Sequence, residues 1–176
     1  MNHRLVRGML LAALAFAAVG ASAQSRESLS DEPVQWQEQA VSMPPAPRRE
    51  ALLPFYVSAT TSNRFFVDSA SLTVDGDGVV RYVLVVETAG GAVNTTFEGM
   101  RCETRERKIY ATGRRDGSWT KSRNEAWEKI RDIAPNRQHA ALFIEHFCPG
   151  GVIVRHAGEA LEALRRGGHP SLQMVN

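Results

Sequence analysis

The chain has 176 residues, 21 basic and 19 acidic side chains, and a formal net charge of +2. Arg4 and Arg7 lie in a predicted leader of 23 residues, so the remaining 153 residues carry equal numbers of basic and acidic side chains. A neutral chain of this length predicts one domain with a tail. Its charge argues against a nucleic acid or a membrane surface as the partner.

The first 23 residues have the pattern of a cleavable secretory signal. The two arginines are followed by an apolar run, Met9–Val19, and by small residues at 21–23, which favours cleavage before Gln24. The run is shorter than the roughly 20 residues that span a bilayer. A lipoprotein would need Cys where Gln24 stands. We therefore expect a soluble periplasmic or secreted protein without a stable membrane anchor.

Cys102 and Cys148 are the only two cysteines. An oxidising compartment favours their pairing, and we predict a disulfide that stabilises the domain by roughly 4 kcal/mol through the loop that it closes. The alternative is a reactive or metal-binding thiol pair. It has less support because neither CxxC nor CxxxC occurs.

Residues 24–50 are predicted to form a flexible arm. They contain many polar side chains, and the prolines of Met43–Pro47 favour an extended polyproline II conformation. Trp36 is the exception in this segment. This large apolar side chain is either a loosely packed aromatic or docks on the domain or on a partner.

Several short segments after residue 50 have the patterns of antiparallel strands. Val79–Glu87 is apolar on both alternating faces through its middle, as expected of a central strand that is covered on two sides. Asp75–Gly78 before it is a typical hairpin turn, and Gly99 is expected to mark a β-bulge. The other expected strands are Leu52–Val57, where Pro54 favours a sheet edge, Phe65–Asp68, Ser71–Val74, Val93–Glu98 with Asn94, Thr96 and Glu98 on a solvated face, and Arg107–Thr112.

The C-terminal third changes to helical spacing. Apolar residues after a plausible N-cap at Asn136 predict a helix that ends near Cys148, and Gly158–Arg166 predicts a second helix. Strands followed by helices, without βαβ alternation, indicate an α+β fold. We expect a single domain over residues 51–176, an antiparallel sheet of about four or five meandering strands with C-terminal helices packed on one side.

Four stretches carry a resemblance to a known family: Ser62–Asp68, the hairpin strands up to Val86, Phe97–Cys102 and Tyr110–Arg114. On these residues the chain resembles the cryptic neisserial protein family, a periplasmic domain of unassigned function. The order of strands and of a helix ending in Cys is also similar to surface-adhesin protein E domains. Neither resemblance implies a catalytic motif.

No catalytic or cofactor-binding motif is recognised. Four histidines lie late in the chain: His139, His146, His156 and His169. The first two share a helix face beside Glu145, but zinc-binding helices place their histidines at i and i+4, and no metal site is predicted. Ser118 lacks the second glycine of GxSxG, and neither a P-loop nor GxGxxG occurs. We predict no catalytic residue, no metal and no cofactor.

The densest charge signal lies in residues 101–123, which contain Arg101, Arg105, Arg107, Lys108, Arg114, Arg115, Lys121 and Arg123. If the strands alternate as expected, several of these project from the solvated sheet face, where arginine suits a phosphate or a carboxylate. The candidate partner-binding residues are Arg101, Arg105, Arg107, Tyr110, Arg114, Arg115 and Trp119. The alternative is a solvated face with internal ion pairs.

These observations favour a non-enzymatic envelope protein that binds a protein or an anionic envelope glycopolymer. The alternative is an envelope hydrolase with an unrecognised active site. A concave pocket with polar groups of shifted pKa would favour the enzyme, whereas a flat basic or aromatic face would favour the binding protein.

Overall fold

The computed structural model describes residues 35–173. The predicted signal of residues 1–23, its cleavage before Gln24 and the first part of the predicted arm lie outside the described residues. The compact unit begins at Trp36. None of the helices described in it has the length and apolar composition needed to cross a membrane.

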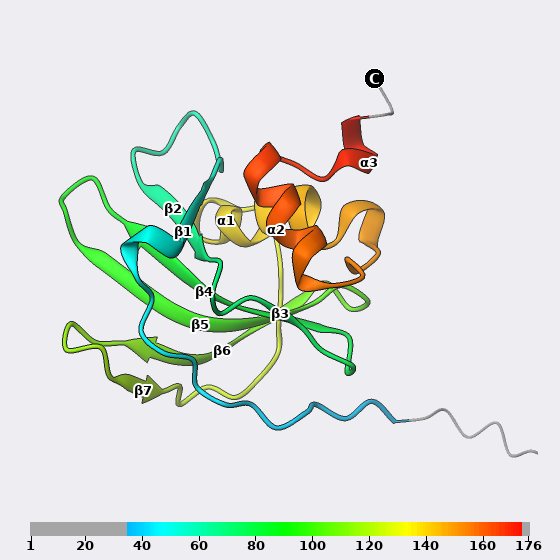
Figure 1. The fold of residues 1–176 in the computed structure, drawn as a ribbon, viewed down its shortest axis with the longest axis horizontal. Helices are drawn as coiled ribbons and strands as arrows, with labels where there is room; N and C mark the ends of the chain where they lie inside the picture. The colour runs from blue at the N-terminus through cyan, green and yellow to red at the C-terminus, as the bar shows by residue number, and fades with distance from the viewer. Residues whose placement is uncertain (1–34, 174–176) are drawn as a thin grey trace, which may run out of the picture. The chain divides into compact units, whose positions relative to one another are not determined.

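An antiparallel sheet forms the centre of this unit (Figure 1). Its strands are β1 (Leu52–Phe55), β2 (Arg64–Asp68), β3 (Thr73–Val74), β4 (Val79–Glu87), β5 (Val93–Arg101), β6 (Glu106–Gly113), β7 (Trp119–Lys121) and β8 (Glu128–Lys129). The order is β1-β2-β4-β5-β6-β7, while β3 pairs with β4 and β8 pairs with β6. Eight strands exceed the expected four or five. β3 lies within the expected segment Ser71–Val74, whereas β7 and β8 were not expected, because they have only three and two residues and are too short to show a period-two pattern.

The helical segments are η1 (Arg49–Ala51), η2 (Ala134–Asn136), α1 (Arg137–Ala141), η3 (Leu142–Phe147), η4 (Pro149–Gly151), α2 (Ala157–Arg166) and α3 (Pro170–Gln173). The first predicted helix is present, but it is α-helical only in α1 and widens to a π-helix in η3. Asn136 makes no side-chain cap, because it already belongs to the 3-10 turn η2. The second predicted helix is α2, which ends at Gly167 with a φ of 73°. The α+β class is as expected.

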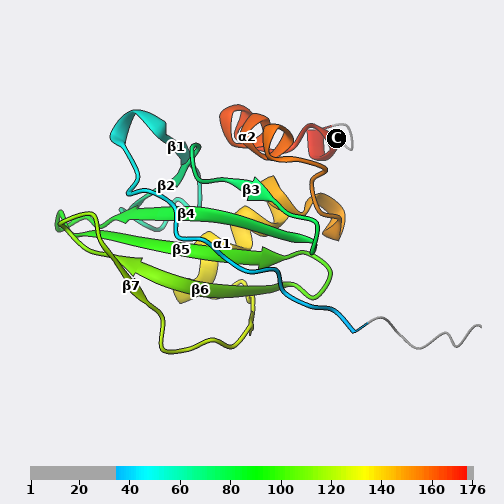
Figure 2. The same cartoon turned by 60° about the horizontal axis from the view of Figure 1, so that its bottom comes forward.

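The helices cover one face of the sheet (Figures 1 and 2). On this face Val80 and Tyr82 of β4 pack in one hydrophobic cluster with Phe147 of η3. The disulfide joins Cys102, at the end of β5, to Cys148, with their Cα atoms 5.5 Å apart. The predicted disulfide is therefore confirmed, and it fastens the helical layer to the sheet.

The opposite face carries a second hydrophobic cluster, which consists of Val83, Val85, Phe97, Tyr110 and Ala111. Residues 36–48, which we call the strap, cross this face without forming a helix or a strand (Figure 2). Val41 of the strap packs against the cluster. The described part of the expected arm thus lies against the sheet, and β4 is covered on both faces as predicted.

The expected position of the β-bulge is wrong. The register between β5 and β6 shifts between Phe97 and Glu98, opposite Tyr110, whereas Gly99 pairs regularly with Lys108. Gly99 has a different role. A Cβ atom at this position would overlap the Tyr110 hydroxyl, so glycine lets the Tyr110 side chain lie across β5.

We expect Gly99→Ala to lower the free energy of unfolding by about 1–3 kcal/mol, because the added methyl group must displace the Tyr110 side chain. The matched control is Gly90→Ala, where a Cβ atom meets no atom closer than 4.0 Å. Urea unfolding measures both variants. Equal stabilities would contradict the described packing of Tyr110.

Replacing Cys102 and Cys148 together by Ser should lower the free energy of unfolding by about 2–4 kcal/mol, because the bridge restrains a long loop of the unfolded chain. The two cysteines are separated by 46 positions. Chemical denaturation of the protein purified without reductant tests this expectation, and peptide mapping without reductant checks the linkage. Free thiols or an unchanged unfolding midpoint would overturn it.

Candidate functional site

Trp36 anchors the first end of the strap. Its indole Nε1 donates a hydrogen bond of 2.7 Å to the backbone carbonyl of Asp77. The guanidinium of Arg101 lies over the Trp36 ring at 3.6 Å from the centroid, and the ring of Trp127 meets it edge-on at 5.8 Å. This arrangement combines a cation–π contact with an aromatic pair. Trp36 is therefore not a loosely packed aromatic: its side chain docks on the domain.

The turn of the β3–β4 hairpin binds the strap next to Trp36. Arg81 of β4 is buried and pairs with the carboxylates of Asp75 and Asp77 at 2.7 and 2.6 Å. Asp77 also accepts a hydrogen bond of 2.9 Å from the backbone N–H of Gln39 in the strap. Burial tends to raise the pKa of Asp77, but the bonds from Arg81 and Gln39 outweigh it and lower the pKa. The predicted turn at Asp75–Gly78 therefore also holds the strap.

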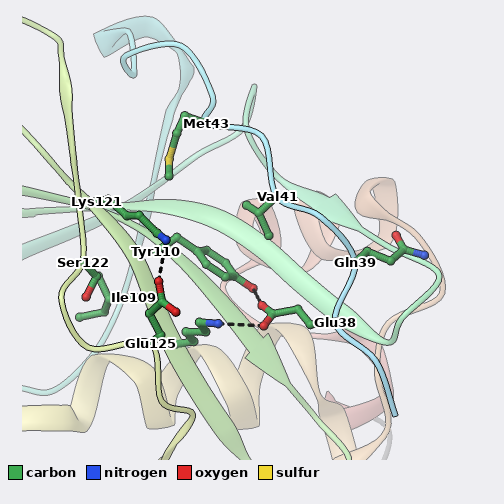
Figure 3. Close-up of a pocket in the computed structure, with 10 residues that line it drawn as sticks. Glu38, Gln39, Val41, Met43, Ile109, Tyr110, Lys121, Ser122 and Glu125 are labelled. Carbon is green, nitrogen blue, oxygen red and sulfur yellow. Dashed lines mark hydrogen bonds and ion pairs between the residues drawn. The ribbon is translucent and has the colours of Figure 1, made fainter. Parts of the chain in front are cut away.

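Glu38 anchors the middle of the strap (Figure 3). Its carboxylate accepts hydrogen bonds from the Nζ of Lys108 at 2.8 Å and from the hydroxyl of Tyr110 at 2.7 Å. Burial tends to raise the pKa of Glu38, but these two bonds and the charge of Lys108 outweigh it and lower the pKa. The pKa of Tyr110 is raised by burial and by Glu38. At the other end of the strap, the indole Nε1 of Trp119 donates to the carbonyl of Pro44 at 2.7 Å.

A groove remains between the strap and the edge of the sheet. The cavity measures about 280 Å³ and is lined by Glu38, Gln39, Val41, Met43, Lys108, Ile109, Tyr110, Lys121, Ser122 and Glu125 (Figure 3). Lys121 pairs with Glu125 at 2.6 Å on one wall, and Glu38 pairs with Lys108 on the other. Val41, Met43 and Ile109 supply apolar surface. The groove thus offers balanced charges beside an apolar strip.

The structure does not bring the basic candidates together on one face. Side chains alternate along a strand, so Arg101 faces the strap, whereas Arg107 faces the helical layer and pairs with Glu128 at 3.1 Å. Arg105 lies in the β5–β6 turn, 5.1 Å from the centroid of the Phe143 ring. Arg114 and Arg115 are exposed in the turn at the opposite end of β6. Of the aromatic candidates, Tyr110 lines the groove and Trp119 binds the strap.

The structure also contains a buried polar cluster that the sequence patterns do not indicate. Glu98, expected on a solvated face, is 1% exposed. Its carboxylate accepts hydrogen bonds from Tyr82 at 3.1 Å and Thr96 at 2.6 Å, and lies 2.9 Å from Nε2 of His139. Burial tends to raise the pKa of Glu98, but His139 and Thr96 outweigh it and hold the pKa at about 2. A carboxylate and an imidazole can exchange a proton, but these groups lie beneath the helical layer.

The other histidines contact residues of the C-terminal helices and of β1. Nδ1 of His156 accepts a hydrogen bond from the backbone of Glu159 at the start of α2, and His169 lies 3.1 Å from the Glu159 carboxylate. His146 is buried beside Phe55. Within residues 35–173, no three His, Cys, Asp or Glu side chains are arranged to hold a metal ion. Ser118 bonds to Asp116 in an exposed turn.

The model of the CNP1-like family matches residues 31–165, and the chain belongs to this family. Over 134 residues the chain is 25% identical to Cryptic neisserial protein 1 of Neisseria gonorrhoeae (strain ATCC 700825 / FA 1090). This match covers 67% of the chain and 66% of the relative, which is just under two thirds of the relative's length. No solved structure matches the chain. The family resemblance found in the sequence is confirmed.

The pKa of Glu98 predicts an acid-dependent loss of stability. Because the pKa is about 2 in the folded chain and 4.5 is the ordinary value, the contribution of ionised Glu98 is complete above about pH 4.5 and declines as the pH falls towards 2. Glu98→Gln should lower stability at pH 7 and flatten this decline. Unfolding measured at several pH values tests the expectation. The control is Glu103→Gln, whose side chain is 83% exposed in the parent and which should lose stability with falling pH as the parent does. The same loss of stability in Glu98→Gln would contradict the account.

Proposed function

We propose that this member of the CNP1-like family is an exported envelope protein without enzymatic activity, which binds an extended segment of a partner protein. The binding site is the groove between the strap and strands β6 and β7. The observation that carries the proposal is the lining of this groove, where two ion pairs lie beside the apolar residues Val41, Met43 and Ile109.

The composition of the groove favours a polypeptide over an anionic glycopolymer. Lys108 and Lys121 are balanced by Glu38 and Glu125, so the groove has no excess of positive charge to attract a polyanion. A peptide segment presents both apolar side chains and backbone hydrogen-bonding groups, which suit such a mixed lining. Arg101 of β5, Arg107 of β6 and Arg114 after β6 are separated over two faces and two ends of this strand pair, which further weakens the glycopolymer alternative.

The hydrolase alternative has less support. The closest acid–base pair, Glu98 with His139, is enclosed between the sheet and α1, and a substrate would have to displace the helical layer to reach it. Export is supported by the leader pattern of residues 1–23 and by the disulfide, which is typical of proteins in oxidising compartments.

In-cell photo-cross-linking tests the proposal. A photoreactive residue replaces Met43, which lines the groove and is 42% exposed, and in a matched variant it replaces Val152, which is 68% exposed and does not line the groove. We expect a discrete protein adduct from position 43 and not from position 152. The same adducts from both positions, or only a carbohydrate adduct from position 43, would contradict the proposal.

Substitutions of two lysines then form a matched pair, and the affinity of the captured partner is measured for each variant. Lys121 and Lys129 are both exposed and both ion-paired, but only Lys121 lines the groove. We expect Lys121→Glu to weaken binding by about tenfold or more, because it places two acidic side chains on one wall of the groove. Lys129→Glu should leave the affinity unchanged. Equal effects of the two variants would place the contact outside the groove.

A further inference from the structure

Two basic side chains lie beneath the strap with little access to water. The side chain of Lys108 is 15% exposed and that of Arg81 is 5% exposed. Lys108 pairs with Glu38 of the strap, and Arg81 pairs with Asp75 and Asp77 of the hairpin turn. A nearly buried cation is strongly destabilising without its carboxylate, unless water can reach it. The docked position of the strap therefore depends on ionised carboxylates.

Tyr110 connects the two groups of ion pairs (Figure 3). Its hydroxyl donates to Glu38 at 2.7 Å, and its ring centroid lies 5.8 Å from the guanidinium carbon of Arg81. The charged and titratable groups around Glu38 are Lys108 and Tyr110 of β6, Arg81 of β4, Asp75 and Asp77 of the hairpin turn, Arg101 of β5 at the Trp36 ring, and Lys121 and Glu125 on the opposite wall of the groove. Within the described residues, Glu38 is the carboxylate that pairs with Lys108.

Acid removes this pairing from the strap. When the strap detaches, Glu38 moves into water, whereas Asp77 keeps its bonds to Arg81 within the hairpin. Burial tends to raise the pKa of Glu38, but the bonds from Lys108 and Tyr110 outweigh it, so the pKa in the docked strap lies below the ordinary value of 4.5. The contribution of ionised Glu38 to docking is therefore complete above about pH 4.5 and is lost as the pH falls through the lowered pKa. Protonated Glu38 also leaves Lys108 without an ion pair beneath the strap.

The two covers of the sheet differ in how firmly they are held. The disulfide between Cys102 and Cys148 ties the helical layer to the sheet, and residues of β1, β2, β4, η3 and α2 share one hydrophobic cluster there. The strap has neither a helix nor a strand, and Val41 is its residue that packs against the smaller cluster on the other face. A segment with few buried apolar contacts opens at a lower cost in free energy than the whole domain. Acid therefore acts first on the strap.

We propose that the strap is an acid-released cover of the sheet, which detaches below about pH 4.5 while the helical layer stays folded. Detachment removes the wall of the groove that the strap supplies through Glu38, Gln39, Val41 and Met43. Release of the strap does not depend on what the groove binds. The consequence that acid also releases the partner segment rests on the proposed function.

Fluorine NMR of the protein labelled with fluorotryptophan and purified without reductant tests the detachment. Trp36 reports the strap, because its ring is held by Arg101 and Trp127 only when the strap is docked. Backbone amide signals of α2 in the same sample report the helical layer. As the pH is lowered, we expect Trp36 to lose its docked signal at a higher pH than α2 loses its amide signals. Loss of both signals at the same pH would overturn the proposal.

Two glutamates that pair with neighbouring residues of β6 form a matched set of variants. Glu38 pairs with Lys108 on the strap face, and Glu128 pairs with Arg107 on the other face. Glu38→Gln removes the charge and keeps an oxygen that accepts from Tyr110, so it should raise the detached fraction at pH 7 by about fivefold or more and flatten its dependence on pH. Glu128→Gln should detach at the parental pH. Parental detachment in Glu38→Gln would also overturn the proposal.

Photo-cross-linking from position 43 with the captured partner, carried out in vitro at several pH values, tests the release of the partner. We expect the adduct formed at pH 7 to be lost over the pH range in which Trp36 loses its docked signal. An adduct that persists after the strap has detached would contradict acid release of the partner. Absence of an adduct at every pH would contradict the proposed function instead, and the Trp36 signal would still decide whether acid detaches the strap.

Discussion

Strand β4 imposes the main constraint on this fold, because its residues Val79–Val85 are buried on both faces. A strand of this kind requires a covering layer on each side of the sheet. Each buried Val, Leu or Phe side chain contributes about 1.5–3 kcal/mol, whereas a whole domain is stable by only about 5–15 kcal/mol. An uncovered face would therefore remove a large part of the stability. The C-terminal helices cover one face, and the strap covers the other.

The strap differs from the helical layer in how it is held. It has no helix or strand of its own. It is held by the side chains of Trp36, Glu38 and Val41, by the backbone N–H of Gln39 and by the backbone carbonyl of Pro44. The groove depends on this arrangement, because Glu38, Gln39, Val41 and Met43 form the strap's share of its lining. The partner proposed for this groove would therefore bind only the docked form of the strap, because the strap supplies part of the lining.

Local patterns were sufficient to predict the central strand, the Asp75–Gly78 turn and the α+β class. The disulfide was predicted from the cysteine count and the oxidising compartment that the leader pattern indicates. Local patterns were insufficient for the strap, because its hydrogen bonds join residues 41, 70 and 75 positions apart, through Asp77, Lys108 and Trp119. A polar, proline-containing segment has no periodicity from which such contacts follow. Its composition predicts an extended chain, and the structure adds where that chain lies.

The site residues were predicted less well, for two physical reasons. Alternation along β6 sends Arg107 to the helical layer while its neighbour Lys108 faces the strap, so a dense basic sequence does not form one basic face. Glu98 has the polar character of a solvated position, but α1 supplies His139 above it and buries both.

A double-mutant cycle between Glu38 and Tyr110 tests the docking of the strap most directly. The free energy of unfolding is measured for the parent, Glu38→Gln, Tyr110→Phe and the double variant, all purified without reductant. Because the Tyr110 hydroxyl donates to the Glu38 carboxylate at 2.7 Å, we predict a coupling energy of about 1–3 kcal/mol. A coupling energy near zero would mean that the strap does not hold this position on the sheet, and would contradict the account.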